Sequence, residues 1–83
     1  MALYIAYVGL GAATEVKLDL PDPYFELRHD LYLIDTTLTR SRLYHQIKHL
    51  LPPDTPLLVA PLADTPKFKG MGAGALNWVR DLA

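Results

Sequence analysis

The order of apolar and polar positions predicts three strands before the first helix. Residues 2–10 (ALYIAYVGL) are almost continuously apolar, which is typical of a central strand covered on both faces. Residues 15–20 alternate between charged and apolar side chains and predict a half-buried strand, which the proline-rich residues 21–23 end. Residues 24–35 predict one long strand, or two short strands with a bulge near residues 29–30.

The second half of the chain changes to helical spacing. Thr39 is a good N-cap for a helix over residues 40–51, and the two prolines at 52–53 end that helix. Residues 55–62 (TPLLVAPL) predict a short buried strand. After a loop, residues 73–82 predict a final helix with an apolar face formed by Leu76, Val79 and either Trp78 or Leu82.

This order predicts a single α+β domain over residues 1–83. Residues 31–62 form a strand-helix-strand unit, which should be a right-handed crossover with its two strands parallel in one sheet. We therefore expect a two-layer sandwich: a mixed or antiparallel sheet of about four strands, with both helices on one face. A chain of 83 residues buries only about 60–65% of its unfolded surface, so pairing with a second copy through the sheet would add stability.

Composition narrows the range of functions. The net charge of −1 and the pI near 6.2 argue against a dedicated nucleic-acid binder, which is usually strongly basic. The absence of cysteine excludes disulfide scaffolds, thiolate catalysis and cysteine-ligated zinc. The apolar runs are too short to span a bilayer and the N-terminus lacks signal-peptide features, so we expect a cytoplasmic protein without membrane contact.

Asp35 is the main candidate for catalysis. It ends an apolar run, and a carboxylate at a strand end can bind a metal or act as a general base. Such chemistry generally needs a second acid or a histidine nearby, and Asp30 should lie on the opposite face of a regular strand. Because Thr36 and Thr37 follow, we interpret Asp35 mainly as part of the turn and cap that lead into the helix, and we assign no catalytic residue.

The predicted first helix carries the densest group of cations in the chain: Arg40, Arg42, His45, Lys48 and His49. These side chains could contact an acidic protein surface or the phosphates of a nucleic acid. The alternative is a solvated helix face whose last residues suit the negative end of the helix dipole. His45 and His49 have helical spacing, but the glutamate of a zinc-binding H-E-x-x-H motif is absent, and we expect no metal.

A glycine-rich segment precedes the last helix. Its residues Lys67, Lys69, Gly70 and Gly72 could bind an anion through backbone amides. The segment matches neither a dinucleotide fingerprint nor a P-loop, so a mobile helix start is the favoured interpretation.

Several segments together resemble a known family. Residues 30–62, the KFKGM segment at 67–71 and the NWV segment at 77–79 are similar to the small SinR-like proteins. That family is related in fold to CRISPR-associated protein 2 and to VapD-type toxins. The resemblance covers residues 30–79 and implies a ferredoxin-like sandwich that forms a homodimer through its sheet.

The first half differs from that family, which has a helix after the first strand. The nuclease relatives also carry a metal-binding aspartate at the end of this strand, where this chain has Val8, and valine cannot bind Mg²⁺. We therefore expect a non-catalytic, dimeric protein that binds a macromolecular partner, either protein or nucleic acid, in a defence, toxin–antitoxin or phage context. The alternatives are a Mg²⁺-dependent nuclease that uses Asp35 or Asp30, and an anion or nucleotide binder at Lys67, Lys69 and the turn over residues 70–74.

Overall fold

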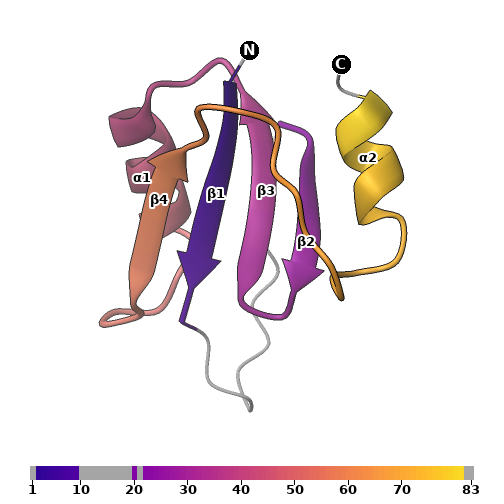
Figure 1. Ribbon diagram of the computed structural model, residues 1–83. Coiled ribbons are helices and arrows are strands. Elements are labelled where there is room, and N and C mark those ends of the chain that lie inside the picture. The colour runs from indigo at the N-terminus through magenta and orange to yellow at the C-terminus, as the bar shows by residue number, and fades with distance from the viewer. Residues whose placement is uncertain (1, 10–19, 21, 82–83) are drawn as a thin grey trace.

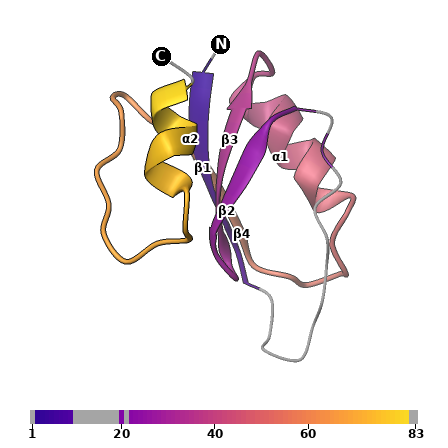
Figure 2. The ribbon, with the colours of Figure 1, turned by 90° about the vertical axis from the view of Figure 1, so that its right-hand side faces the viewer.

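The computed structural model describes residues 2–9, 20 and 22–81, and within them a four-stranded sheet has one helix on each face (Figures 1 and 2). The elements in chain order are β1 (Ala2–Val8), β2 (Tyr24–Arg28), β3 (Leu31–Thr36), α1 (Arg40–Lys48), β4 (Leu57–Pro61) and α2 (Ala75–Asp81). The α+β class and the predicted order of three strands, helix, strand and helix are confirmed.

The sheet has the strand order β2-β3-β1-β4, and every neighbouring pair is antiparallel. Because β1 pairs with both β3 and β4, these two strands run parallel on either side of it, as the strand-helix-strand pattern predicted. The strand order is that of a ferredoxin-like sheet, a fold in which a helix joins the first two strands. Here that connection lies largely outside the described residues.

The three strands that precede α1 differ in part from the predicted ones. The strand predicted over residues 15–20 lies outside the described residues except for Leu20, which is buried in the core. Residues 24–35 form two strands joined by a turn at residues 29–30, with a register shift between Glu26 and Arg28. The expectation of two short strands that meet near residues 29–30 is therefore confirmed, whereas the irregularity lies earlier than the predicted bulge.

The prediction that both helices cover one face is wrong, because they lie on opposite faces of the sheet (Figure 2). The reason is the continuous apolar character of β1. Its residues Tyr4, Ala6 and Val8 face α1, whereas Leu3 and Ile5 face α2. Since successive residues of a strand point to opposite faces, a strand without polar positions needs cover on both.

The first core lies between the sheet and α1. It contains Tyr4, Ala6, Val8, Leu20, Tyr32, Ile34, Leu43 and Ile47. The helix begins at the predicted cap: the Thr39 hydroxyl oxygen accepts a hydrogen bond from the Arg42 N–H at 3.3 Å. It ends at Lys48 with His49 as C-cap, three residues before the predicted end.

The second core lies between the sheet and α2, which is shorter than predicted. Ala75 and Val79 are buried, and the Trp78 ring packs against Phe25 with ring centroids 5.8 Å apart. Leu76, predicted to face the core, is 51% exposed. The helix begins two residues later than expected, and Ala75 takes the buried position.

The glycine-rich segment before α2 is docked on β2. The Gly72 N–H donates to the Leu27 carbonyl at 2.8 Å, and a Cβ at Gly72 would lie 3.0 Å from the Glu26 carbonyl oxygen. The absence of a side chain therefore allows this close approach of two backbones.

Substitution of Gly72 with alanine is expected to lower the free energy of unfolding by about 1–3 kcal/mol, because the new methyl group meets backbone that has little freedom to move. Chemical denaturation of Gly72→Ala beside the exposed neighbour Ala73→Ser measures this effect. Equal stability of the two variants would contradict the close approach.

Candidate binding surface

Helix α1 separates an apolar face from a basic face. Leu43 and Ile47 are buried against the sheet. The basic surface, which we define as Arg40, Arg42, His45 and Lys48, is exposed over the rest of the helix, with Arg40 at its first turn. The structure therefore brings together the cationic residues that the sequence indicated on this helix.

The charges of the basic surface are not balanced locally. The first turn of α1 has no acidic residue, and among the described residues no carboxylate forms an ion pair with these four side chains. A cation near the C-terminal end, such as Lys48, is favoured by the helix dipole. Arg40 and Arg42 lie at the opposite end, where the dipole disfavours positive charge. Helix stability therefore does not explain the two arginines.

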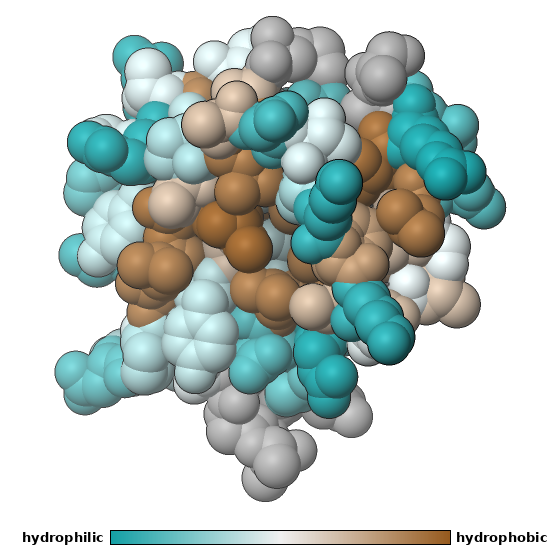
Figure 3. All heavy atoms as spheres, in the orientation of Figure 1, coloured by the Kyte–Doolittle hydropathy of each residue, from teal (hydrophilic) through white to brown (hydrophobic). Residues whose placement is uncertain are grey.

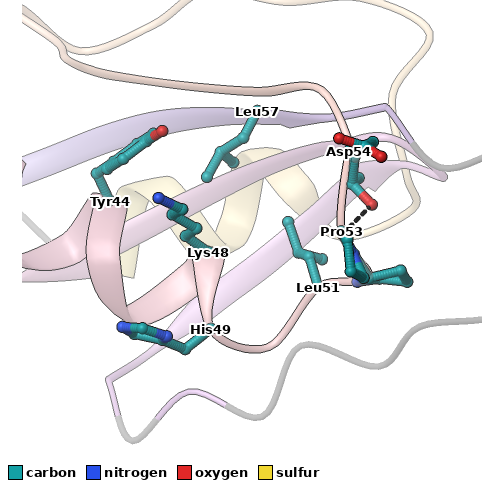
Figure 4. A pocket seen from close by; sticks show the side chains of 9 residues that line it. Tyr44, Lys48, His49, Leu51, Pro53, Asp54 and Leu57 are labelled. Carbon is teal, nitrogen blue, oxygen red and sulfur yellow. Dashed lines mark hydrogen bonds between the residues drawn. The ribbon is translucent and has the colours of Figure 1, made fainter.

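Two hollows lie between α1 and β4, on either side of Tyr44. The first hollow has a volume of about 180 Å³ and is lined by Arg40, Ser41, Tyr44, His45 and Val59. The second hollow measures about 360 Å³ and is lined by Tyr44, Lys48, His49, Leu51, Pro52, Pro53, Asp54, Thr55 and Leu57 (Figure 4). The basic surface thus continues into a furrow beside β4.

The second hollow is bounded by the turn between α1 and β4. The Thr55 hydroxyl donates to the Pro52 carbonyl at 2.8 Å and holds this turn closed. In Figure 4 the side chains of Tyr44, Lys48 and Leu57 approach one another. Aromatic, cationic and aliphatic groups are therefore presented together at this surface.

Asp35 lies apart from this surface. Its side chain is 5% exposed, and it pairs with Leu3, whose side chain faces α2. Its Oδ2 atom is buried without a hydrogen-bond partner. The expectation that Asp35 supplies the turn and cap before α1 is therefore wrong, because its side chain points to the other face of the sheet.

The joint between β3 and α1 is built by residues that the sequence reasoning did not single out. The Thr36 hydroxyl donates to Asp22 Oδ2 at 2.7 Å and accepts from the Leu38 N–H at 3.0 Å. Thr36 faces α1 because it follows Asp35 by one residue. The two threonines that directly follow Asp35 in the sequence are the signal that could have indicated this joint.

The structure does not bring a carboxylate to the basic helix from the positions considered for a nuclease. Asp35 faces the other side of the sheet, and Asp30 lies in the turn before β3. Val8, where the resemblance places a metal ligand, is fully buried in the first core. Within the described residues no group of three His, Cys, Asp or Glu side chains could hold a metal ion.

Removal of the unpartnered carboxylate is expected to stabilise the protein. Asp35→Val should raise the free energy of unfolding by about 1–3 kcal/mol, because a buried oxygen without a hydrogen bond carries its full desolvation penalty. Thermal and chemical denaturation measure the change, with the partly exposed Asp30→Val as the comparison. A loss of stability in Asp35→Val would contradict this account of the carboxylate.

The glycine-rich candidate for anion binding lies on the α2 side. Lys69, Gly70 and Gly72 line a hollow of about 460 Å³ together with Arg80, which the sequence reasoning missed. Lys67 is not part of this lining. The hollow is on the face opposite the basic surface, so the two cationic groups cannot serve one compact ligand.

Tyr32 is the one described residue whose ionisation is clearly perturbed. Burial raises the pKa of its phenol, and the negative charge of Glu26 raises the pKa further, with smaller effects from Tyr24 and Asp30. Its hydroxyl donates to the His29 carbonyl at 3.4 Å. The phenol therefore stays neutral at physiological pH and serves packing.

The fold and this surface define a small antiparallel α+β sandwich with an exposed basic helix on one face and a second helix on the other. Comparisons with protein-family models, with curated proteins and with solved structures find no match to this chain. Neither α1 nor α2 has the length or the apolar character of a membrane-spanning helix.

Proposed function

We propose that the protein is a non-catalytic binding protein whose basic surface on α1 docks onto an acidic region of a partner protein. The observation that carries this proposal is the placement of Arg40 and Arg42. Both are exposed, neither pairs with a carboxylate of the described residues, and both stand where the helix dipole opposes them. Contact with an acidic partner would compensate this cost.

A protein partner fits better than a nucleic acid. The net charge of the chain is −1, so a long phosphate backbone would be repelled by much of the molecule outside α1. The hollows beside the helix also present Tyr44, Leu57 and Val59, which suit side chains better than phosphates. The kinship to SinR-like proteins and a role in defence, toxin–antitoxin or phage biology belong to this proposal through the resemblance alone. The cytoplasmic location belongs to it through the short apolar runs of the sequence.

A homodimer through the sheet is part of the same proposal. Its support is the apolar surface that α2 leaves open over β1 and β4, where Tyr7 is 40% and Leu58 is 59% exposed (Figure 3). Light scattering at increasing protein concentration measures the dimer, and a monomer at all concentrations would exclude it.

Capture from an extract of the organism that encodes the chain tests the proposed function. Nuclease-treated extract is passed over the immobilised protein, and bound protein is eluted with increasing salt. We expect an acidic protein that elutes as salt screens the charges. Retention that depends on intact RNA or DNA would contradict the choice of a protein partner.

The absence of catalysis is tested separately with labelled RNA and DNA in the presence of Mg²⁺ or Mn²⁺. We expect no cleavage. Cleavage that disappears in Asp35→Ala would overturn the non-catalytic assignment in favour of a metal-dependent nuclease.

A further inference from the structure

The two edges of the sheet differ. At the β2 edge, the Gly72 N–H donates a hydrogen bond to the Leu27 carbonyl, so the glycine-rich segment covers part of that strand. At the other edge, β4 pairs with β1 alone among the described residues, and Figure 1 shows it at the border of the sheet. A strand edge without a partner is a template for pairing with another chain.

The hydrogen bonds that flank β4 show which of its backbone groups point outward. The Leu62 N–H donates to the Leu3 carbonyl at 2.9 Å, and the Gly9 N–H donates to the Pro56 carbonyl at 2.8 Å. In an antiparallel ladder the groups of alternate residues turn toward the same neighbour. Residues 56, 58, 60 and 62 therefore turn toward β1.

Leu57, Val59 and Pro61 consequently turn their backbone groups away from the sheet. Leu57 and Val59 each offer an N–H and a carbonyl, whereas Pro61 offers only a carbonyl. A proline inside a strand is tolerated where its missing N–H would have pointed to solvent. The sequence of β4 thus agrees with an open edge.

The side chains beside this edge indicate the chemistry of an added strand. On the α1 face, Val59 lines the first hollow and Leu57 lines the second, with Tyr44 between them. The two positions are about 7 Å apart, the spacing of side chains on one face of a strand. Successive side chains of an added strand on that face would therefore meet the two hollows.

Each hollow has a cationic side chain: Arg40 lines the first, and Lys48 lines the second, which Asp54 also borders. Acidic side chains suit these positions. On the other face of the sheet, Leu58 is exposed beside the edge, and an apolar side chain of the added strand would pack against it. An added strand would therefore place acidic side chains on the α1 face of the sheet and apolar side chains on the α2 face, so acidic and apolar residues would alternate along it.

We propose that the partner adds an extended segment of alternating acidic and apolar residues to β4, with its acidic side chains in the two hollows beside α1. This inference rests on the proposed function and names the form of the partner. A second copy of the chain fits less well, because Leu57–Pro61 carries no acidic residue and a two-fold pairing would bring two basic surfaces together.

The test is an NMR titration of the ¹⁵N-labelled full chain with a short synthetic peptide of alternating glutamate and valine. A peptide of the same composition, with all glutamates before all valines, is the matched control. We expect the amide signals of Leu57 and Val59 to shift and to exchange more slowly with solvent. The alternating peptide should bind about tenfold more tightly than the control.

Two variants separate backbone pairing from charge. Val59→Pro removes an outward N–H and should weaken binding about five- to tenfold if the variant folds, as judged by circular dichroism. Arg40→Glu combined with Lys48→Glu keeps the edge and should transfer the preference to a peptide of alternating lysine and valine. Unchanged preference in this double variant would overturn the proposal.

Other outcomes separate this inference from the proposed function. Capture of an acidic protein together with no binding of the alternating peptide would refute the strand addition and leave the function standing. Peptide binding without any captured protein would support the edge site and remove the proposed function. Protection of the Leu57 and Val59 amides in the free protein, growing with concentration, would assign the edge to a second copy and overturn the inference.

Discussion

Replacement of Val8 by aspartate is expected to abolish the folded state. Val8 is fully buried in the first core, under the side of α1 that carries Leu43 and Ile47. An unpaired charge at such a position costs several kcal/mol or must be neutralised by protonation. Small domains have only about 5–15 kcal/mol of stability, and a chain of this size has a small core. Circular dichroism and the dispersion of amide NMR signals report the loss.

Tyr7→Asp is the matched control for this prediction. Tyr7 precedes Val8 in β1 but is 40% exposed on the opposite face, so the same charge should be tolerated. A folded Val8→Asp protein would show that the core adapts to a carboxylate. Mg²⁺-dependent cleavage of RNA or DNA by that variant would go further and indicate a nuclease site at this position. The expected unfolding instead means that a carboxylate at position 8 is incompatible with this core.

The second large effect is expected when the basic surface is reversed in charge. A variant with Arg40, Arg42 and Lys48 all changed to glutamate should bind the captured partner at least about 100-fold more weakly, from roughly 1 kcal/mol for each reversed charge. The three side chains are exposed and do not form ion pairs with the described residues, so the fold should remain intact. Surface plasmon resonance or calorimetry measures the affinity.

The chain offers a control with the same change in net charge. Lys69 and Arg80 line the hollow on the α2 side, and Lys67 is exposed in the segment before α2. Reversal of these three charges to glutamate also changes the net charge by −6, from −1 to −7. This control should retain affinity within a few-fold of the unmodified protein. Equal weakening in both variants would attribute binding to overall charge and would remove the assignment to α1.

Much of the fold could be predicted from local sequence. The uninterrupted apolar run of β1 indicated a central strand covered on both faces, and β1 pairs with β3 and β4 and contributes side chains to both cores. Thr39 was recognised as the N-cap because a hydroxyl before a helical stripe has few other roles. The exposure of Arg42, His45 and Lys48 followed from the same stripe, since these residues lie away from Leu43 and Ile47 on the helix. Arg40 has the spacing of the buried stripe, and its exposure at the first turn did not follow from that pattern.

The predictions that were wrong concern features set by tertiary packing, namely the faces covered by the two helices and the role of Asp35. Each helix packs on the face of the sheet that its connection reaches. Because β1 is apolar on both faces, its pattern does not distinguish two helices on one face from one helix on each face. The sequence places Asp35 near the joint between β3 and α1, but successive residues of a strand point to opposite faces. Thr36, one residue later, therefore faces α1 and hydrogen-bonds to Asp22. The furrow between α1 and β4 joins residues 40–48 to residues 57–59, a pairing that no local pattern contains.

The central claim is that the partner docks on α1, and site-specific photo-crosslinking in the encoding organism tests it most directly. A photoreactive amino acid replaces exposed Ser41 on α1 in one variant and exposed Asn77 on α2 in the other. We predict a discrete protein adduct from position 41 that is absent from position 77. An adduct from position 77 alone, or no adduct from position 41, would contradict the docking of a partner on the basic helix.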